Sequence, residues 1–348
     1  MFCRILRRGK GRKLYLYSLK KKVYTKTKGL ESINQTGQHL RWNELRDEWV
    51  FYSPLRQERT FKPVKSNCPL CPTLTDGPAT DIPVTDYEIA VFDNRFSALS
   101  STPPKIKKIK DVIVNHSFGN CEVVSYSPDH RKNLYSLKTE QVALLMKVWS
   151  DRFINLMKSS NIKYVLPFEN RGKEIGVTLN HPHGQIYGFP EIPPIIKKQA
   201  SKQKESLLIS NLVNSVNENL EISRDNNAIS FVPYFARYPF EIWIAPFKKV
   251  DHAGFLNDEE INSMAILLKS SIKRLDKLFN KPMAYTMAIN FPPKGFEGSF
   301  HHYIALQPMR RDENKLKHLA GIEQITGLML SDIVPENSAK KLKRIIID

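Results

Sequence analysis

The stretch Asn180-His181-Pro182-His183-Gly184-Gln185-Ile186-Tyr187 decides how the rest of the chain is interpreted. Residues i and i+2 of a β-strand point to the same face, so a strand here would direct His181, His183 and Gln185 to one site. Gly184 has no Cβ, and another group can approach the backbone closely at that point. Two imidazoles on an otherwise apolar strand need polar partners. The stretch therefore predicts a polar site whose other members come from elsewhere in the chain.

The overall composition is that of a soluble globular enzyme. The chain has 348 residues, of which 41% are hydrophobic and 25% charged, and this length predicts two domains or one large one. No apolar run approaches the roughly 18 residues that cross a bilayer, and the N-terminus lacks the uninterrupted apolar core of a secretory signal. Four cysteines, only two of them close together, do not make a disulfide framework. We therefore expect a cytoplasmic protein.

Positive charge is concentrated at the N-terminus. The formal net charge is +18, and residues 1–30 hold eleven Lys or Arg side chains and no acid. Such a segment can bind polyanions, target an organelle or be a translated leader, whereas a solvated basic tail needs no partner. We expect residues 1–39 to form a flexible basic arm, with the globular part beginning near residue 40. The basic residues are Arg4, Arg7, Arg8, Lys10, Arg12, Lys13, Lys20, Lys21, Lys22, Lys26 and Lys28.

Two landmarks recur at nearly the same spacing. The dipeptide Asp129-His130 recurs 122 residues later as Asp251-His252, and the His181–His183 stretch recurs 120 residues later as His301–Tyr303. In both copies the chain between the landmarks contains an amphipathic helix, a strand and a loop, and a second strand follows. This repetition predicts a duplicated α+β unit with a mainly antiparallel sheet and helices packed on it.

The duplication divides the chain into two halves, which we place at residues 40–195 and 196–348. Thr139 and Asn257 are the N-caps expected for the helix of each copy. The second copy lacks both the Cys-x-x-Cys pair and the His-Pro-His pair of the first. We therefore expect the first half to carry the chemistry and the second to shape the substrate pocket or an interface.

Cys68-x-x-Cys71 supplies two candidate metal ligands. The pair lies in a Pro-rich loop, and His130 with one histidine of the 181–183 stretch would complete a Cys₂His₂ set, which suits tetrahedral Zn²⁺. A redox pair is the less favoured interpretation, because no redox-type βαβ pattern surrounds it, and two unliganded thiols are a third. The zinc interpretation leaves the other histidine free for catalysis.

A free histidine there could act as a nucleophile. Neutral imidazole can attack phosphorus, and a backbone carbonyl bonded to one ring nitrogen would decide which nitrogen attacks. The resulting phosphoramidate needs donors for its non-bridging oxygens, and Gln185 is placed for that task. The chain has no Walker A or Gly-x-Gly-x-x-Gly motif, so side chains must hold the phosphates. The candidates are Arg56, Arg59, Asn94 and Asn170.

Several stretches occur together in a characteristic order. They are Glu48-Trp49-Val50, Ser53-Pro54-x-Arg56-x-x-Arg59, Cys68-Pro69-Leu70-Cys71, Phe92-Asp93-Asn94-Arg95-Phe96, Tyr126-Ser127-Pro128-Asp129-His130, Phe168-Glu169-Asn170-Arg171-Gly172, Gly176-x-Thr178-x-x-His181-Pro182-His183-Gly184-Gln185, Pro233-Tyr234-x-Ala236-Arg237, and Lys315-Leu316-Lys317-x-Leu319-Ala320-Gly321-x-Glu323. With these, the chain resembles the galactose-1-phosphate uridylyltransferase family of the histidine-triad superfamily from about residue 40 to its end.

The resemblance implies a duplicated histidine-triad-like fold and a ping-pong transfer. His183 would attack the α-phosphorus of UDP-glucose, release glucose 1-phosphate and pass UMP to galactose 1-phosphate, with Gln185 on the phosphoryl oxygens. It also implies a homodimer whose site is shared between subunits. Zinc would be held by Cys68, Cys71, His130 and His181. Substrates would be contacted by Arg56, Arg59, Asn94, Asn170 and Thr178, and by Lys317 and Glu323 of the C-terminal segment.

Two alternatives remain at this point. A related nucleotidyltransferase or phosphorylase would act on ADP-glucose or dinucleoside polyphosphates, since the sequence does not fix the shape of the base pocket. Gln185 favours a transferase over a histidine-triad hydrolase, because a third histidine there would protonate a leaving group. A zinc-containing, basic nucleic-acid-binding module is the non-enzyme alternative. The concentration of excess charge in residues 1–30 argues against it.

Overall fold

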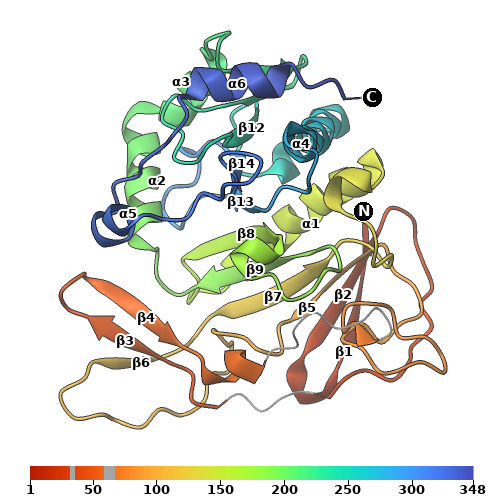
Figure 1. The fold of residues 1–348 in the computed structure, drawn as a ribbon. Helices are drawn as coiled ribbons and strands as arrows, with labels where there is room; N and C mark the ends of the chain where they lie inside the picture. The colour runs from red at the N-terminus through yellow and green to blue at the C-terminus, as the bar shows by residue number, and fades with distance from the viewer. Residues whose placement is uncertain (32–35, 59–66, 348) are drawn as a thin grey trace.

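A computed structural model describes residues 1–31, 36–58 and 67–347. Within them, eleven strands form one sheet in the order β1-β2-β5-β7-β9-β8-β13-β14-β12-β11-β10, and three more form a separate sheet, β4-β3-β6 (Figure 1). Every pair of neighbouring strands is antiparallel. None of the described helices is long and apolar enough to cross a membrane.

The predicted duplication is confirmed by the order of the strands. The first unit runs β5 (Ile89–Asp93), β7 (Asn120–Ser125), α1 (Thr139–Met157), β8 (Tyr164–Arg171) and β9 (His183–Phe189). The second runs β11 (Ala228–Phe231), β12 (Ile242–Pro246), α4 (Asp258–Leu278), β13 (Tyr285–Asn290) and β14 (Tyr303–Pro308). Their spatial orders, β5-β7-β9-β8 and β11-β12-β14-β13, are the same, and β8 pairs with β13 where the two units meet. The fold is α+β, as predicted.

Helices α1 and α4 pack against each other and form the main core with one face of the sheet. In α1 the buried side chains Val142, Leu145, Trp149 and Phe153 follow the spacing of one helical face. Asn257 caps α4, and Glu260 returns a hydrogen bond to the backbone N–H of the cap, as in a capping box. Thr139 is instead the first residue of α1, so the expected cap was one residue out of place.

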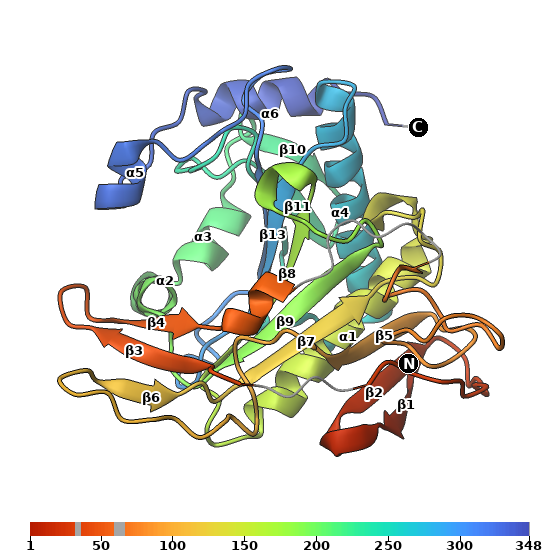
Figure 2. The same ribbon diagram turned by 60° about the horizontal axis from the view of Figure 1, so that its bottom comes forward.

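The N-terminal segment is not a free arm in this structure. Strand β1 (Phe2–Arg7) pairs with β2 (Lys13–Ser18), and β2 pairs with β5 at the edge of the large sheet (Figure 2). Leu14 and Leu16 are fully buried on one face of β2, while on the other face Lys13 is exposed, Tyr15 is half-buried and Tyr17 is buried. The prediction of a flexible arm over residues 1–39 is therefore wrong for residues 2–18. The many Lys and Arg residues in this segment concealed the two-residue repeat of apolar side chains that is typical of a β-strand.

The smaller sheet projects from the body of the molecule beside the first unit (Figures 1 and 2). It consists of β3 (His39–Asn43), β4 (Glu48–Tyr52) and β6 (Val114–His116), and Val50, Phe51 and Tyr52 are partly exposed on it. Among the described residues, the remaining strand is β10 (Glu221–Arg224) and the remaining α-helices are α2 (Pro194–Ser206), α3 (Leu208–Asn214), α5 (Gly321–Thr326) and α6 (Pro335–Lys343).

Candidate active site and metal centre

His183 is the first residue of β9 and is held by the backbone of its neighbour in the motif. Its Nδ1 lies 2.7 Å from the carbonyl oxygen of His181. A carbonyl only accepts, so Nδ1 carries the proton and Nε2 carries the lone pair. Burial lowers the pKa of the half-buried His183 ring below its usual value. The site therefore presents a neutral imidazole whose Nε2 is unprotonated.

Strand pairing places three side chains on one face of β9. Val123 of β7 lies opposite Gln185, and Ser125 lies opposite His183. His183, Gln185 and Tyr187 thus share the face turned away from α1, while Ile186 between them enters the core. This confirms the strand expected at the motif, although the strand begins at His183 and leaves His181 just before it.

Position 184 requires glycine because Tyr126 and Phe168 pack closely against the backbone there. A Cβ built on Gly184 would lie 2.1 Å from the hydroxyl of Tyr126 and 2.8 Å from the carbonyl oxygen of Phe168. Because real Cβ atoms do not approach other atoms so closely, only glycine fits between β7 and β8 at this position. This close packing fixes the position of β9, the strand that carries His183 and Gln185, relative to Tyr126 and Phe168.

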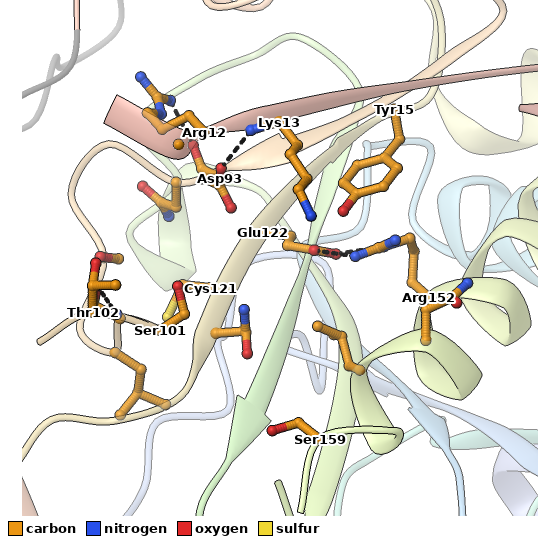
Figure 3. Close-up of a pocket in the computed structure, with 18 of the residues that line it drawn as sticks. Arg12, Lys13, Tyr15, Asp93, Ser101, Thr102, Cys121, Glu122, Arg152 and Ser159 are labelled. Carbon is orange, nitrogen blue, oxygen red and sulfur yellow. Dashed lines mark hydrogen bonds and ion pairs between the residues drawn. The ribbon is translucent and has the colours of Figure 1, made fainter. Parts of the chain in front are cut away.

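Two hollows border the loop after β5. A cavity of about 910 Å³ lies on the α1 side of the sheet (Figure 3), and a pocket of about 100 Å³ contains His183, Gln185 and Thr178. The larger cavity is not lined by the two motif histidines, so the chemistry of the motif belongs to the smaller pocket. Asn94 and Arg95 line both.

The small pocket combines donors with an apolar lining. The Asn94 side-chain amide donates to Oε1 of Gln185 at 3.4 Å, an orientation that leaves the NH₂ group of Gln185 available to an oxygen of a ligand. Leu70, Phe92 and Val123 supply apolar surface. Such a pocket can receive an anionic group beside a flat or apolar one.

Of the other predicted substrate contacts, two lie beside the face of β9 that carries Gln185, one lies outside the described residues, and two pair with each other. Arg56, in the turn after β4, donates through Nη1 to the hydroxyl of Tyr187 at 3.3 Å, so it reaches the face of β9 that carries Gln185. Asn170 follows two residues after Phe168, which lies opposite Gln185, so strand alternation places it on the same face. Arg59 lies outside the described residues.

Lys317 and Glu323 are brought to each other rather than to His183. The ammonium of Lys317 lies 2.6 and 2.7 Å from the two oxygens of Glu323, and both side chains are buried. The carboxylate also accepts the backbone N–H groups of Ala320 and Leu330. The Lys317 hydrogen bond, followed by these two, lowers the pKa of Glu323 to about 2. Neither residue lines the pocket that holds His183.

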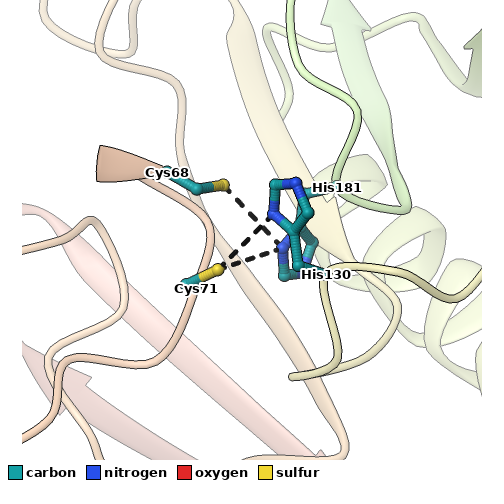
Figure 4. A group of neighbouring side chains, drawn as sticks. All are labelled: Cys68, Cys71, His130 and His181. Carbon is teal, nitrogen blue, oxygen red and sulfur yellow. Dashed lines mark hydrogen bonds between the residues drawn. The ribbon is translucent and has the colours of Figure 1, made fainter. Parts of the chain in front are cut away.

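Four predicted metal ligands meet in one cluster (Figure 4). Nδ1 of His181 lies 3.8 Å from Sγ of Cys68 and 3.6 Å from Sγ of Cys71, and Nδ1 of His130 lies 3.6 Å from Sγ of Cys71. All four ligand atoms lie within 4.8 Å of one another. Zn–S bonds of about 2.3 Å and Zn–N bonds of about 2.0 Å at tetrahedral angles place S and N about 3.5 Å apart. The spacing and the donor set therefore fit zinc.

The tautomer of His181 also suits a ligand. Its Nε2 lies 2.7 Å from the carbonyl oxygen of Ser127, so Nε2 donates and Nδ1 points a lone pair at the thiols. Tyr87, which is buried, places its hydroxyl 3.2 Å from the same nitrogen and within hydrogen-bond distance of the carbonyl of Leu70. These contacts orient the ring in the manner of the outer shell of a metal site.

Sequence reasoning missed some residues of this region. Tyr187 could have been found from the period of two that runs through His183 and Gln185. Arg95 was quoted in a motif but given no role, although it lines the pocket beside His183 and its Nε lies 3.9 Å from the carboxylate of Asp81. Arg8 and Arg12 of the hairpin approach the same carboxylate, at 3.8 and 3.6 Å. No local signal in the sequence links these distant residues.

Comparison with known proteins assigns the family. The family models "Galactose-1-phosphate uridyl transferase, N-terminal domain" and "C-terminal domain" match residues 29–193 and 195–347. A galactose-1-phosphate uridylyltransferase of Thermotoga maritima is 33% identical over 315 residues, which cover 87% of this chain and 97% of the relative. A solved uridylyltransferase structure has a TM-score of 0.77 at 28% identity and covers 88% of this chain and 97% of that one.

A second group of relatives carries another name. An ADP-glucose phosphorylase of Arabidopsis thaliana is 25% identical over 345 residues, covering 90% of this chain and 95% of the relative. A crystal structure of an ADP-glucose phosphorylase from that plant, with bound ADP-glucose, has the same fold at a TM-score of 0.67, covering 90% of this chain and 100% of that one. The uridylyltransferase of Thermotoga maritima shares the greater identity. The chain belongs to the galactose-1-phosphate uridylyltransferase family.

Proposed function

We propose that this chain transfers a uridylyl group from UDP-glucose to galactose 1-phosphate through a covalent uridylyl-histidine at His183. The observation that carries the proposal is the hydrogen bond from Nδ1 of His183 to the carbonyl of His181, which leaves Nε2 as the nucleophile. Membership of the family supports the choice of substrates.

The transfer divides into two displacements at one phosphorus. The lone pair of His183 Nε2 forms an N–P bond to the α-phosphorus while the bond from that phosphorus to the bridging oxygen breaks, and glucose 1-phosphate leaves with the electron pair. A phosphate oxygen of galactose 1-phosphate then attacks, and the N–P bond breaks. Because both leaving groups are weakly basic, neither step needs a general acid. A neutral amide, Gln185, at the position next to the nucleophile suits this chemistry.

The substrate contacts follow from the face of β9. Gln185 would donate to a non-bridging phosphoryl oxygen, as its free NH₂ group supports. Arg56, Asn94, Asn170 and Thr178 would hold the remaining phosphate oxygens and the nucleoside, and Arg59, outside the described residues, is proposed from the family pattern alone.

We further propose that Cys68, Cys71, His130 and His181 hold one zinc ion. Zinc bound by this set would serve as a structural crosslink between the Cys68–Cys71 loop and the segment that precedes β9. The support is the donor set, the S···N distances and the orientation of His181. The backbone of His181 holds His183, so the same crosslink would stabilise the position of the nucleophile.

We also propose that the protein is a cytoplasmic homodimer whose active site is shared between the two subunits. In one chain the Lys317–Glu323 pair does not line the pocket at His183, so a second copy would be the source of these contacts to the phosphate or hexose. The proposed halves, 40–195 and 196–348, are supported by the family models, which meet between residues 193 and 195.

One labelling experiment tests the proposal. The protein is incubated with UDP-glucose carrying radioactive phosphorus at the α-position, and acid-labile, base-stable label on protein is measured. We expect labelling of the wild type and of His116→Gly, an exposed histidine of β6, but none of His183→Gly. Labelling by ADP-glucose but not by UDP-glucose would favour the phosphorylase alternative. Labelling of the His183→Gly protein would contradict the proposal that His183 is the nucleophile.

A further inference from the structure

The β1–β2 hairpin closes one side of the cavity of about 910 Å³ (Figure 3). The hairpin precedes the region matched by the family models, residues 29–193 and 195–347. Leu14 and Leu16 of β2 pack into the core on the opposite face, so Lys13, Tyr15 and Tyr17 point to the α1 side and line the cavity. The cavity in this form therefore depends on a segment that the family models do not include.

A buried ion pair forms the floor of the cavity. Arg152 of α1 donates to Glu122 of β7 through Nε at 2.9 Å and through Nη2 at 2.5 Å, and the two side chains are only 4% and 3% exposed. The Arg152 guanidinium also lies 3.9 Å from the centre of the Tyr15 ring. Glu122 is thus neutralised, and one face of Tyr15 is already covered, which disfavours a ligand that must stack on it.

Each acid that lines the cavity accepts a hydrogen bond, whereas the Lys13 ammonium donates to no acceptor among the described residues. The carboxylate of Asp93 accepts the backbone N–H of Lys13 at 3.0 Å, and that of Asp151 accepts the hydroxyl of Tyr17 at 2.5 Å. The Lys13 ammonium has no hydrogen-bond or ion-pair partner among the described residues, and Figure 3 shows it directed into the cavity. Over the whole lining, the four cations Arg12, Lys13, Arg95 and Arg152 outnumber the three acids Asp93, Glu122 and Asp151, so the cavity carries a formal net charge of +1.

The opposite wall offers hydroxyl and amide groups. A volume of about 910 Å³ is within the range of small-molecule sites, and such groups hydrogen-bond to a ligand that is rich in hydroxyls. We propose that this cavity is a second ligand site, separate from the pocket at His183, for a phosphorylated polyol whose phosphate pairs with Lys13. The wall residues that would meet its hydroxyls are Ser100, Ser101, Thr102, Asn120, Asn155 and Ser159.

Any test must separate this cavity from the pocket at His183, because a phosphorylated ligand could enter either. Calorimetric titration of the full chain with glucose 6-phosphate, inorganic phosphate and glucose makes the distinction through variants. Lys13→Ala removes the cation, and Ser101→Trp fills the exposed rim. Lys21→Ala removes an exposed lysine outside the cavity, and Gln185→Ala shortens a side chain that lines only the pocket at His183.

We expect saturable binding of glucose 6-phosphate, weaker binding of phosphate and none of glucose. Lys13→Ala should weaken glucose 6-phosphate at least about tenfold, the usual effect of losing a hydrogen bond to a charged group. Ser101→Trp should do the same, while Lys21→Ala and Gln185→Ala retain wild-type affinity. The proposal is overturned by absence of saturable binding, by wild-type affinity in Lys13→Ala, by loss of binding in Gln185→Ala, or by equal affinities for phosphate and glucose 6-phosphate.

Discussion

The carbonyl oxygen of His181 lies 2.7 Å from Nδ1 of His183, so the residue whose ring belongs to the Cys/His cluster positions the proposed nucleophile with its backbone. In the proposed function the two histidines of the motif would have separate roles, and the hydrogen bond between them would link those roles. Disturbing the cluster should disturb His183 without touching its ring.

Loss of a cluster thiol should remove the metal and weaken the fold. In Cys68→Ala we expect zinc, measured by mass spectrometry of the freshly purified protein, to fall from one ion per chain to near zero. The melting temperature should fall by at least about 5 °C, because structural zinc contributes folding free energy directly. Cys3→Ala, which alters an exposed cysteine, is the control. Full zinc in Cys68→Ala would exclude this ligand set.

The amide of Gln185 should matter for the rate of uridylylation. Gln185→Ala removes a donor to the phosphoryl oxygens, and we expect the labelling rate to fall about 10²-fold, as for other donors that stabilise developing charge. Gln185→Glu should be at least as slow, because a carboxylate repels those oxygens. Rapid-quench measurement with labelled UDP-glucose checks both rates, with Gln199→Ala on the surface of α2 as the control. A wild-type rate in Gln185→Ala would remove this role.

Much of the fold could be predicted because its signals are local. The spacing of Val142, Trp149 and Phe153 predicts α1, and the repeated landmarks predict the duplication. The β1–β2 hairpin could not be recognised in the same way. Its buried positions, Leu14 and Leu16, stand among residues whose charge resembles that of a solvated tail, and only pairing with β5 turns them into core.

The site shows the same division between local and long-range information. The two-residue spacing of His183 and Gln185 sets the shared face of β9, and the donor types at Cys68 and Cys71 predict a metal cluster. The partners that orient these groups come from distant segments, as Tyr87 does for His181. The mutual pairing of Lys317 and Glu323 likewise depends on the course of the loop between them, which composition does not reveal.

The contact between Tyr126 and Gly184 gives a prediction about packing. Gly184→Ala would place a methyl group 2.1 Å from the Tyr126 hydroxyl, so the strand must shift, and we expect a loss of about 1–3 kcal/mol in stability together with reduced labelling of His183. Gly188→Ala in the same strand is the matched control, because its nearest neighbours lie at 3.4 Å, an ordinary contact. Urea unfolding and the labelling assay measure both effects. Equal stability and equal labelling of the two variants would contradict this prediction and show that the Tyr126 side chain moves aside at little cost.

A buried carboxyl beneath the site should make stability depend on pH. Glu169 accepts the hydroxyl of Tyr285 at 2.9 Å, and burial, partly opposed by this hydrogen bond, raises its pKa to about 7. In the unfolded chain the pKa is about 4.3. Between these values the folded state binds the extra proton, so the Glu169 contribution to the free energy of unfolding falls as pH rises from about 4.3 to 7 and is constant above.

Replacing Glu169 by Gln should remove that dependence. Relative to Glu169→Gln, we expect the wild type to lose about 2–3 kcal/mol of stability between pH 5 and pH 8, from the difference between the two pKa values. Glu140→Gln, an exposed residue in the first turn of α1, should run parallel to the wild type. Urea unfolding at both pH values measures the difference. Parallel curves for the wild type and Glu169→Gln would mean that the folded-state pKa of Glu169 is ordinary and that the network with Tyr285 keeps the carboxylate charged.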